Sequence, residues 1–163
     1  MESTTGTLEA LGNATPGQEY TDYSVIRLRN DQGRSVLLKD ARVFRQADTA
    51  LSLGERVTLH HASCVRKTDD GKASIRYALV FATTEDGGET LDDINDVASA
   101  RATLKWGGIM GAVISIPFMF IIVGFFMFIN SMGTLAHAAS MPSKQQMRAY
   151  LERQLSASTK MES

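Results

Sequence analysis

The chain has 163 residues, enough for one domain of the usual ~100 to 150 residues and an appended segment. It carries 17 Lys and Arg against 18 Asp and Glu, and this balance excludes a global field that would draw nucleic acid or anionic lipid to the protein. The single cysteine, Cys64, excludes an intramolecular disulfide and gives no sign of an oxidising compartment.

The amino-terminal half predicts strands separated by turns. Residues 1–5 are expected to be disordered, and no secretory signal is expected because a basic segment followed by an apolar one is missing. The stretches YSVIRLRN and RSVLLKD flank the turn NDQG and have the signature of a hairpin, in which Gly33 supplies a positive φ. The stretches ERVTLHHASC and ASIRYALVFATT predict two more strands, with a turn at Asp69–Lys72 between them.

Residues 6–83 are therefore predicted to form a small antiparallel β-barrel. The layout of a hairpin, an irregular segment and two further strands resembles an OB-type barrel, and an SH3-like barrel or a small sandwich is the alternative. The resemblance is one of pattern and rests on no family motif.

Residues 84–89, with the sequence TEDGGE, have the composition of a linker. Residues 90–105 predict a juxtamembrane helix, because Thr90 can cap it and acids cluster in its first turn.

Residues 106–130 predict one transmembrane helix. No Asp, Glu, Lys or Arg occurs from Trp106 to Ser143, and ~20 apolar residues are enough to cross the hydrocarbon core of a bilayer. Lys105 and Trp106 are the expected anchors at the membrane interface. Pro117 is expected to kink the helix.

Residues 131–163 predict a carboxyl-terminal tail with a short helix at about 142–156. The expected fold class is thus an α+β membrane protein, in which the barrel is followed by the juxtamembrane helix, one transmembrane helix and a short helix. Positive charges flank the span almost equally, and we expect the amino-terminal domain to be cytoplasmic because it would need export without a signal. The expected location is a membrane crossed once, the inner membrane if the cell is bacterial.

Small residues recur at a spacing of four at the start of this span. Such a row lets two helices approach closely and is typical of helix packing within membranes. It therefore predicts self-association or packing against other membrane subunits. The residues expected to form this packing face are Gly107, Gly108, Gly111, Ala112 and Ser115.

Metal binding and catalysis are not expected. On a regular strand His60 and His61 face opposite sides, and Cys64 lies ~13 Å from His60 at ~3.3 Å per residue, too far for a shared zinc. No base and nucleophile occur in a triad-like pattern, and no glycine-rich phosphate loop is present. We expect no metal, no cofactor, no enzymatic activity and no small-molecule substrate.

Basic and aromatic residues alternate along the predicted barrel, which is typical of barrels that bind single-stranded nucleic acid. The residues of this expected patch are Arg27, Arg29, Arg42, Arg45, Tyr23 and Tyr77.

The preferred interpretation is a membrane-anchored barrel that serves as a protein-interaction module, a subunit or adaptor with membrane lipid and further copies or membrane subunits as partners. The alternative is a membrane-tethered binder of single-stranded nucleic acid or anionic headgroups.

Overall fold

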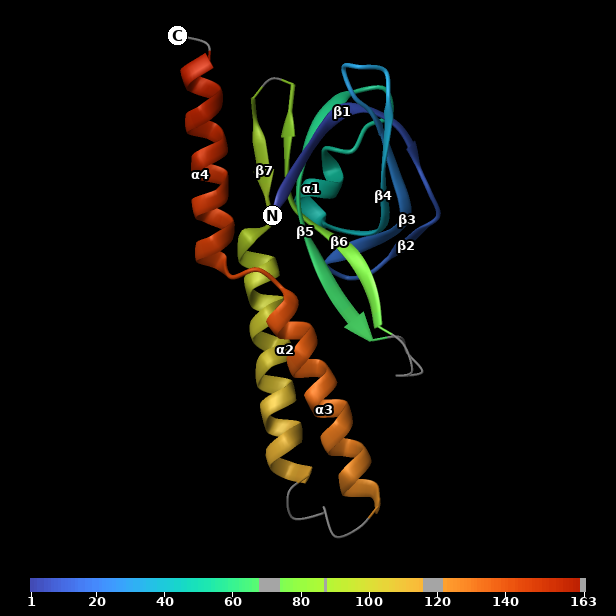
Figure 1. Ribbon diagram of the computed structural model, residues 1–163, viewed down its shortest axis with the longest axis vertical. Coiled ribbons are helices and arrows are strands. Elements are labelled where there is room, and N and C mark those ends of the chain that lie inside the picture. The colour runs from blue at the N-terminus through green and yellow to red at the C-terminus, as the bar shows by residue number, and fades with distance from the viewer. Residues whose placement is uncertain (68–73, 87, 116–121, 162–163) are drawn as a thin grey trace.

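The computed structural model describes residues 1–67, 74–86, 88–115 and 122–161. It shows a β-barrel from which a pair of long helices extends, with a further helix along one side of the barrel (Figure 1). The strands are β1 (Glu2–Leu11), β2 (Ala14–Pro16), β3 (Tyr20–Arg29), β4 (Ser35–Phe44), β5 (Arg56–Lys67), β6 (Ser74–Glu85) and β7 (Thr90–Asp92). The helices are α1 (Arg45–Thr49), α2 (Ile94–Ser115), α3 (Ile122–Ser140) and α4 (Lys144–Met161).

Five of the strands close into a barrel in the order β1-β5-β6-β4-β3, and β3 pairs back to β1. Among the described strands every pairing is antiparallel except that of β4 with β6, because the chain crosses from one to the other through α1 and β5. The short β2 extends the sheet beside β3, and β7 extends it beside β6. The β-barrel predicted from the sequence is confirmed, but one of its pairings is parallel where an antiparallel barrel was expected, and its OB-like layout stays a prediction.

The first hairpin is held by its turn residues. The side chain of Asn30 accepts hydrogen bonds from the backbone N–H groups of Gln32 (3.1 Å) and Arg34 (2.9 Å). Gly33 has a φ of +73°, a conformation that costs glycine little because it has no Cβ. The NDQG turn predicted from the sequence is confirmed here. The turn predicted at Asp69–Lys72 lies outside the described residues.

The barrel interior is filled by alternate apolar residues of its strands. Strand residues with buried side chains on this face include Ile26 and Leu28 of β3 and Val57 and Leu59 of β5. Helix α1 closes one end, with Ala47 buried in the same cluster. The whole interior cluster consists of Leu8, Ile26, Leu28, Ala41, Val43, Ala47, Val57, Leu59 and Val80.

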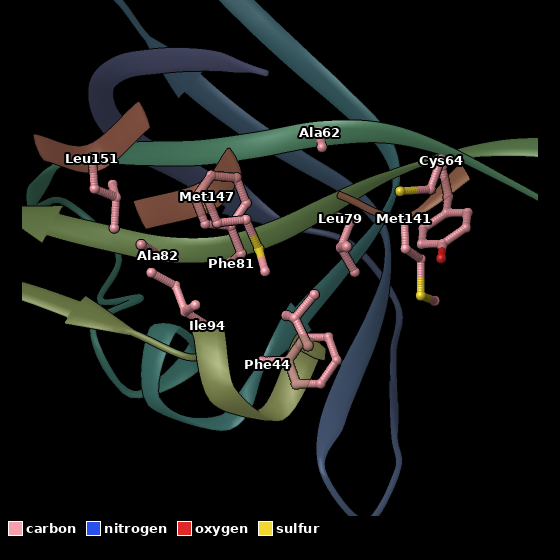
Figure 2. Packing of buried hydrophobic residues seen from close by; sticks show 12 residues of the cluster. Phe44, Ala62, Cys64, Leu79, Phe81, Ala82, Ile94, Met141, Met147 and Leu151 are labelled. Carbon is pink, nitrogen blue, oxygen red and sulfur yellow. The ribbon is translucent and has the colours of Figure 1, made fainter. Parts of the chain in front are cut away.

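A second core lies between the outer face of the barrel and the helices. On β6 the side chains of Leu79 and Phe81 point into it, whereas Val80 between them belongs to the barrel interior. Figure 2 shows these side chains gathered with Ile94 of α2 and Met147 of α4. Strand β6 therefore reads as a nearly continuous apolar run because both of its faces are covered.

Asp93, directly before α2, joins that helix to α1. Its buried carboxylate accepts hydrogen bonds from the backbone N–H groups of Gln46 (3.1 Å) and Ala47 (2.8 Å), which would otherwise lack partners at the start of α1. Burial raises the pKa of Asp93 above its ordinary value, and the two backbone hydrogen bonds oppose that rise. This contact fixes the direction in which α2 leaves the barrel.

The prediction of a transmembrane helix at 106–130 is wrong, and with it the membrane fold class and the single-pass membrane location. Within the described ranges, no helix has both the length and the apolarity needed to cross a membrane. Helix α2 ends at Ser115 and α3 begins at Ile122, so the predicted span is divided between two helices that lie side by side (Figure 1). The predicted kink at Pro117 lies outside the described residues.

The other predicted boundaries differ from the observed ones as follows. Residues 2–5, expected to be disordered, belong to β1, and part of the expected linker at 84–89 belongs to β6. The expected juxtamembrane helix at 90–105 begins with β7 and continues as the first half of α2. The tail at 131–163 contains the end of α3 and the whole of α4, which includes most of the short helix expected at about 142–156.

Candidate functional site

Helices α2 and α3 form a hairpin whose inner face is built from small residues. A Cβ at Gly108 would lie 2.7 Å from Cγ of Leu135, and a Cβ at Gly111 would lie 2.5 Å from Oγ of Ser131. Both distances are too short for real atoms, so the close approach of the two helices depends on glycine at these positions. Ser115 is fully buried and its hydroxyl donates to the carbonyl of Ala112 at 2.8 Å.

The small-residue face expected from the sequence is therefore used inside the chain. Gly108 and Gly111 face α3, whereas a Cβ at Gly107 would meet nothing within 4 Å. Ala112 is half-buried on α2. The spacing by four identified a helix-packing surface, and the surface that it contacts is the chain's own α3.

The base of the hairpin is fixed to the barrel by polar contacts of α3 with β5 and β6. The hydroxyl of Ser140 accepts a hydrogen bond from the backbone N–H of Val65 at 3.1 Å. His137 Nε2 lies 3.0 Å from the hydroxyl of Tyr77. A Cβ at Gly133 would lie 2.8 Å from Cε of Lys67, so helix and strand are in direct contact there. The hairpin is thus held at one end, and the other end extends beyond the barrel (Figure 1).

The outer side of the hairpin exposes large apolar side chains. Trp106, Met110 and Val113 follow the spacing i, i+4, i+7 and lie on one face of α2, with exposed fractions of 64%, 54% and 55%. Among the hairpin residues whose side chains are described, the exposed large apolar ones are Trp106, Met110, Val113, Ile114, Met127, Ile129 and Met132. A row of exposed large apolar side chains along one helix, as on α2, is typical of a site that binds another macromolecule.

Lys105 and Trp106 are both exposed side chains within α2. Their expected role as anchors at a membrane interface depended on the span at 106–130, which the structure does not contain. Trp106 instead begins the exposed apolar stripe of α2.

Arg42 and Tyr77 of the expected basic and aromatic patch lie close together on the outer face of the barrel. The guanidinium of Arg42 stacks on the ring of Tyr20, 3.8 Å from its centroid, and lies 5.5 Å from the ring centroid of Tyr77. Both oxygens of Asp22 accept from Arg42 at 2.7 Å. Burial lowers the pKa of Arg42, but the hydrogen bonds and charge of Asp22 outweigh it and the net pKa is raised. Arg66 approaches the same carboxylate at 3.5 Å.

The charges around Arg42 and Tyr77 explain the protonation state of His137. Burial lowers its pKa, and the nearby positive charges of Arg42 and Arg66 lower it further, so its imidazole is neutral at neutral pH. Burial also raises the pKa of the Tyr77 hydroxyl, which therefore remains protonated. Since Arg42 is largely buried and paired with Asp22, the cluster offers little free positive charge to a phosphate backbone.

The other residues of the expected patch are dispersed. Tyr23 donates from its hydroxyl to Asp48 at 2.8 Å, and burial followed by this contact raises its pKa to about 12. Arg29 pairs with Glu9, Arg45 donates to the carbonyl of Gln18, and Arg27 is exposed on β3. The structure thus brings Arg42 and Tyr77 together, but it does not bring all six residues of the expected patch together. Their arrangement gives no support to the nucleic-acid alternative.

The consecutive histidines of β5 lie at an irregularity of the sheet. The register with β6 shifts between His60 and His61, and both side chains are buried. His61 Nε2 lies 3.0 Å from Oγ1 of Thr4, and His60 Nε2 lies 3.1 Å from Oγ1 of Thr84. Cys64 is buried, and burial raises its pKa to about 11, so the thiol is protonated at neutral pH.

Comparison of the chain with protein-family models, with curated proteins and with solved structures finds no match. The prediction that the chain is not an enzyme stays a prediction.

Sequence reasoning missed the residues that complete the Arg42 cluster. Asp22 lies directly opposite Arg42 in the β3–β4 hairpin. Counting pairs outward from the NDQG turn would have placed an acid against this arginine, which indicates a satisfied ion pair rather than a free cation. His137 had no such signal, because it arrives from α3, 60 residues from Tyr77 in the sequence.

Proposed function

We propose that this protein is a self-associating interaction module, in which the barrel carries the α2–α3 hairpin as a docking surface for a second copy of the chain. Two hairpins that pack through the exposed apolar stripe of α2 bring the α2 helices of the two copies together about a two-fold axis. The observation that carries this proposal is the exposed apolar stripe of Trp106, Met110 and Val113 on a helix whose opposite face is already packed on α3.

Because the hairpin carries no charged residue from residue 106 onward, a second copy of the chain fits it better than a charged partner does. No Asp, Glu, Lys or Arg occurs from residue 106 to residue 143, so a charged partner surface would lose its hydration here without gaining a counter-charge. The same hairpin on another copy is also apolar and uncharged, and a two-fold axis places identical patches against each other.

The interface would centre on α2. Trp106, Met110, Val113 and Ile114 are each about half exposed there, and the neighbouring residues of the hairpin would supply the rest of the ~800 Å² per partner that a standard interface buries. A Cβ at Gly107 would meet nothing within 4 Å, so this glycine lowers the surface beside Trp106 and allows a helix of the second copy to approach.

The test is the oligomeric state of the full chain across a concentration series, measured by sedimentation velocity or light scattering after size exclusion. The wild type is expected to form dimers. Met110→Glu is expected to weaken dimerisation at least ~10-fold, because association would bury an unpaired carboxylate. The matched control is Leu53→Glu, since Leu53 is 64% exposed and lies outside the hairpin.

Circular dichroism establishes that both variants are folded. A wild type that stays monomeric at every concentration contradicts the proposal, and so does a Met110→Glu variant that dimerises like the Leu53→Glu control. A further test is Val113→Cys, which should give an intermolecular disulfide on mild oxidation while the buried Cys64 remains reduced.

A further inference from the structure

Four threonines form a row across four neighbouring strands on the outer face of the sheet. Thr5 of β1 pairs with Thr58 of β5, Thr58 pairs with Thr84 of β6, and Thr84 pairs with Thr90 of β7. The hydroxyl oxygens of Thr5 and Thr58 are 2.9 Å apart, and those of Thr84 and Thr90 are also 2.9 Å apart. With strands ~4.8 Å apart, the row presents hydroxyl groups over ~14 Å.

Helix α4 turns this row into the floor of a pocket. Leu151, Gln154 and Leu155 of α4 line one side, and Ser3 and His60 join the threonines on the strands. Figure 1 shows α4 alongside β7 and the adjacent edge of the barrel. The pocket has a volume of about 210 Å³. Among the residues that the structure describes, none that lines it carries a formal charge at neutral pH.

His60, one of the residues that line this pocket, has a buried ring nitrogen without a hydrogen-bond partner among the described residues. Its side chain is 4% exposed, and its Nε2 is engaged with Oγ1 of Thr84 at 3.1 Å. Its Nδ1 has no hydrogen-bond partner in the described part of the chain. Buried polar atoms without partners are rare in folded proteins, and one in a pocket wall marks a place where a ligand atom would be stabilised.

The chemistry of the lining favours an uncharged ligand. Burial, followed by the neighbouring His61, lowers the pKa of His60 to about 4, so the imidazole carries no charge that would attract an anion at neutral pH. A charged ligand would lose hydration without meeting an opposite charge. Threonine and serine hydroxyls donate and accept hydrogen bonds, so they match a ligand that does both.

We propose that this pocket binds a small polyhydroxyl compound, of the size of one sugar ring or smaller. Its hydroxyl groups bond the threonine row and Nδ1 of His60, and its C–H face packs against Leu151. A volume below the ~300 to 1,000 Å³ of pockets for drug-sized ligands sets the upper limit on size. The pocket lies on the barrel beside α4, so ligand binding there does not depend on dimerisation through the α2–α3 hairpin.

The test is a nuclear magnetic resonance titration of the full chain with D-glucose, D-galactose, myo-inositol and, as a charged counterpart, D-glucuronate. At least one neutral probe is expected to give saturable shifts at the amides of Thr58 and Thr84 in the millimolar range, and D-glucuronate is expected to bind more weakly than D-glucose. The proposal is overturned if no neutral probe gives a saturable shift, or if the charged probe binds better than every neutral one.

Two variants assign the binding to the pocket. His60→Gln keeps an amide near the position of Nε2 for Thr84 and removes Nδ1, so the binding constant should fall ~10-fold. The matched control His61→Gln changes the neighbouring residue, which does not line this pocket, and should bind like the wild type. If His60→Gln fails to fold, the binding constant of Thr58→Val is measured instead, because this change preserves side-chain shape at a half-buried site. Unchanged affinity in the folded pocket variants overturns the assignment.

Discussion

The buried His60 predicts that acid destabilises this protein in a defined pH window. Burial holds its pKa at about 4 in the folded chain, against 6.5 in the unfolded chain. Above pH 6.5 the imidazole is neutral in both states and contributes no pH dependence. Between pH 6.5 and about 4 the unfolded chain binds a proton that the folded chain does not, so the free energy of unfolding decreases as the pH falls.

The size of the effect follows from the two pKa values. Each factor of ten in proton affinity corresponds to ~1.4 kcal/mol, so the difference between 6.5 and about 4 amounts to about 3 kcal/mol, which solvent screening reduces to about 2 kcal/mol. The pKa values of His61 and His137 are also lowered by burial, so the wild type has a further dependence of the same sign.

The variant His60→Gln isolates the contribution of His60. Urea unfolding of the wild type and of the variant is measured at about pH 7.5, above the predicted window, and at about pH 4.5, near its lower end. The wild type should lose about 2 kcal/mol more than the variant between the two pH values. An equal loss in the two proteins would show that His60 titrates normally in the folded state and would refute its burial as a neutral group.

Three further outcomes are expected. Gly108→Ala should lower the free energy of unfolding by ~1 to 3 kcal/mol because its Cβ overlaps α3. Gly107→Ala places its Cβ in open space and should raise the free energy of unfolding by ~0.5 to 1 kcal/mol. Thermal melts in which Gly108→Ala stabilises the chain and Gly107→Ala destabilises it would contradict the hairpin packing. Asp93→Ala should cost ~1 to 3 kcal/mol by leaving two backbone N–H groups of α1 without an acceptor, and the exposed Asp96→Ala less than ~1 kcal/mol; equal midpoints in urea would argue against that contact. Cys64, buried and with a pKa of about 11, should react with a thiol reagent only as fast as the chain opens, so rapid labelling without denaturant would exclude the buried position.

The barrel could be predicted from the sequence because its signals are local. Alternation along β3 and β4, with Gly33 in the turn between them, defines a hairpin without knowledge of the rest of the chain. The alternation of side chains along β6 was also visible in the sequence, but it did not show what each face of the strand packs against. Leu79 and Phe81 could face the barrel interior or a helix, and only the tertiary structure shows that they face the helices.

The helical hairpin could not be predicted, because an apolar run of this length has the same composition in one long helix as in two packed helices. The distinction lies in pairing across the hairpin, where Gly108 meets Leu135 and Gly111 meets Ser131. Such complementarity between distant positions leaves no periodic signal in a single helix. The pocket beside α4 was missed for a related reason, since the four threonines come from four different strands and align only through register.

The second core has a consequence for how the chain can be divided. Strand β6 and helices α2 and α4 share one apolar cluster, to which Met147 and Leu151 contribute from near the carboxyl end of the chain. A fragment that ends before α2 would leave Leu79 and Phe81 open to water over the outer wall of the barrel. The barrel and its helices should therefore unfold in a single cooperative transition, and a proteolytic cut between them should release no stable barrel.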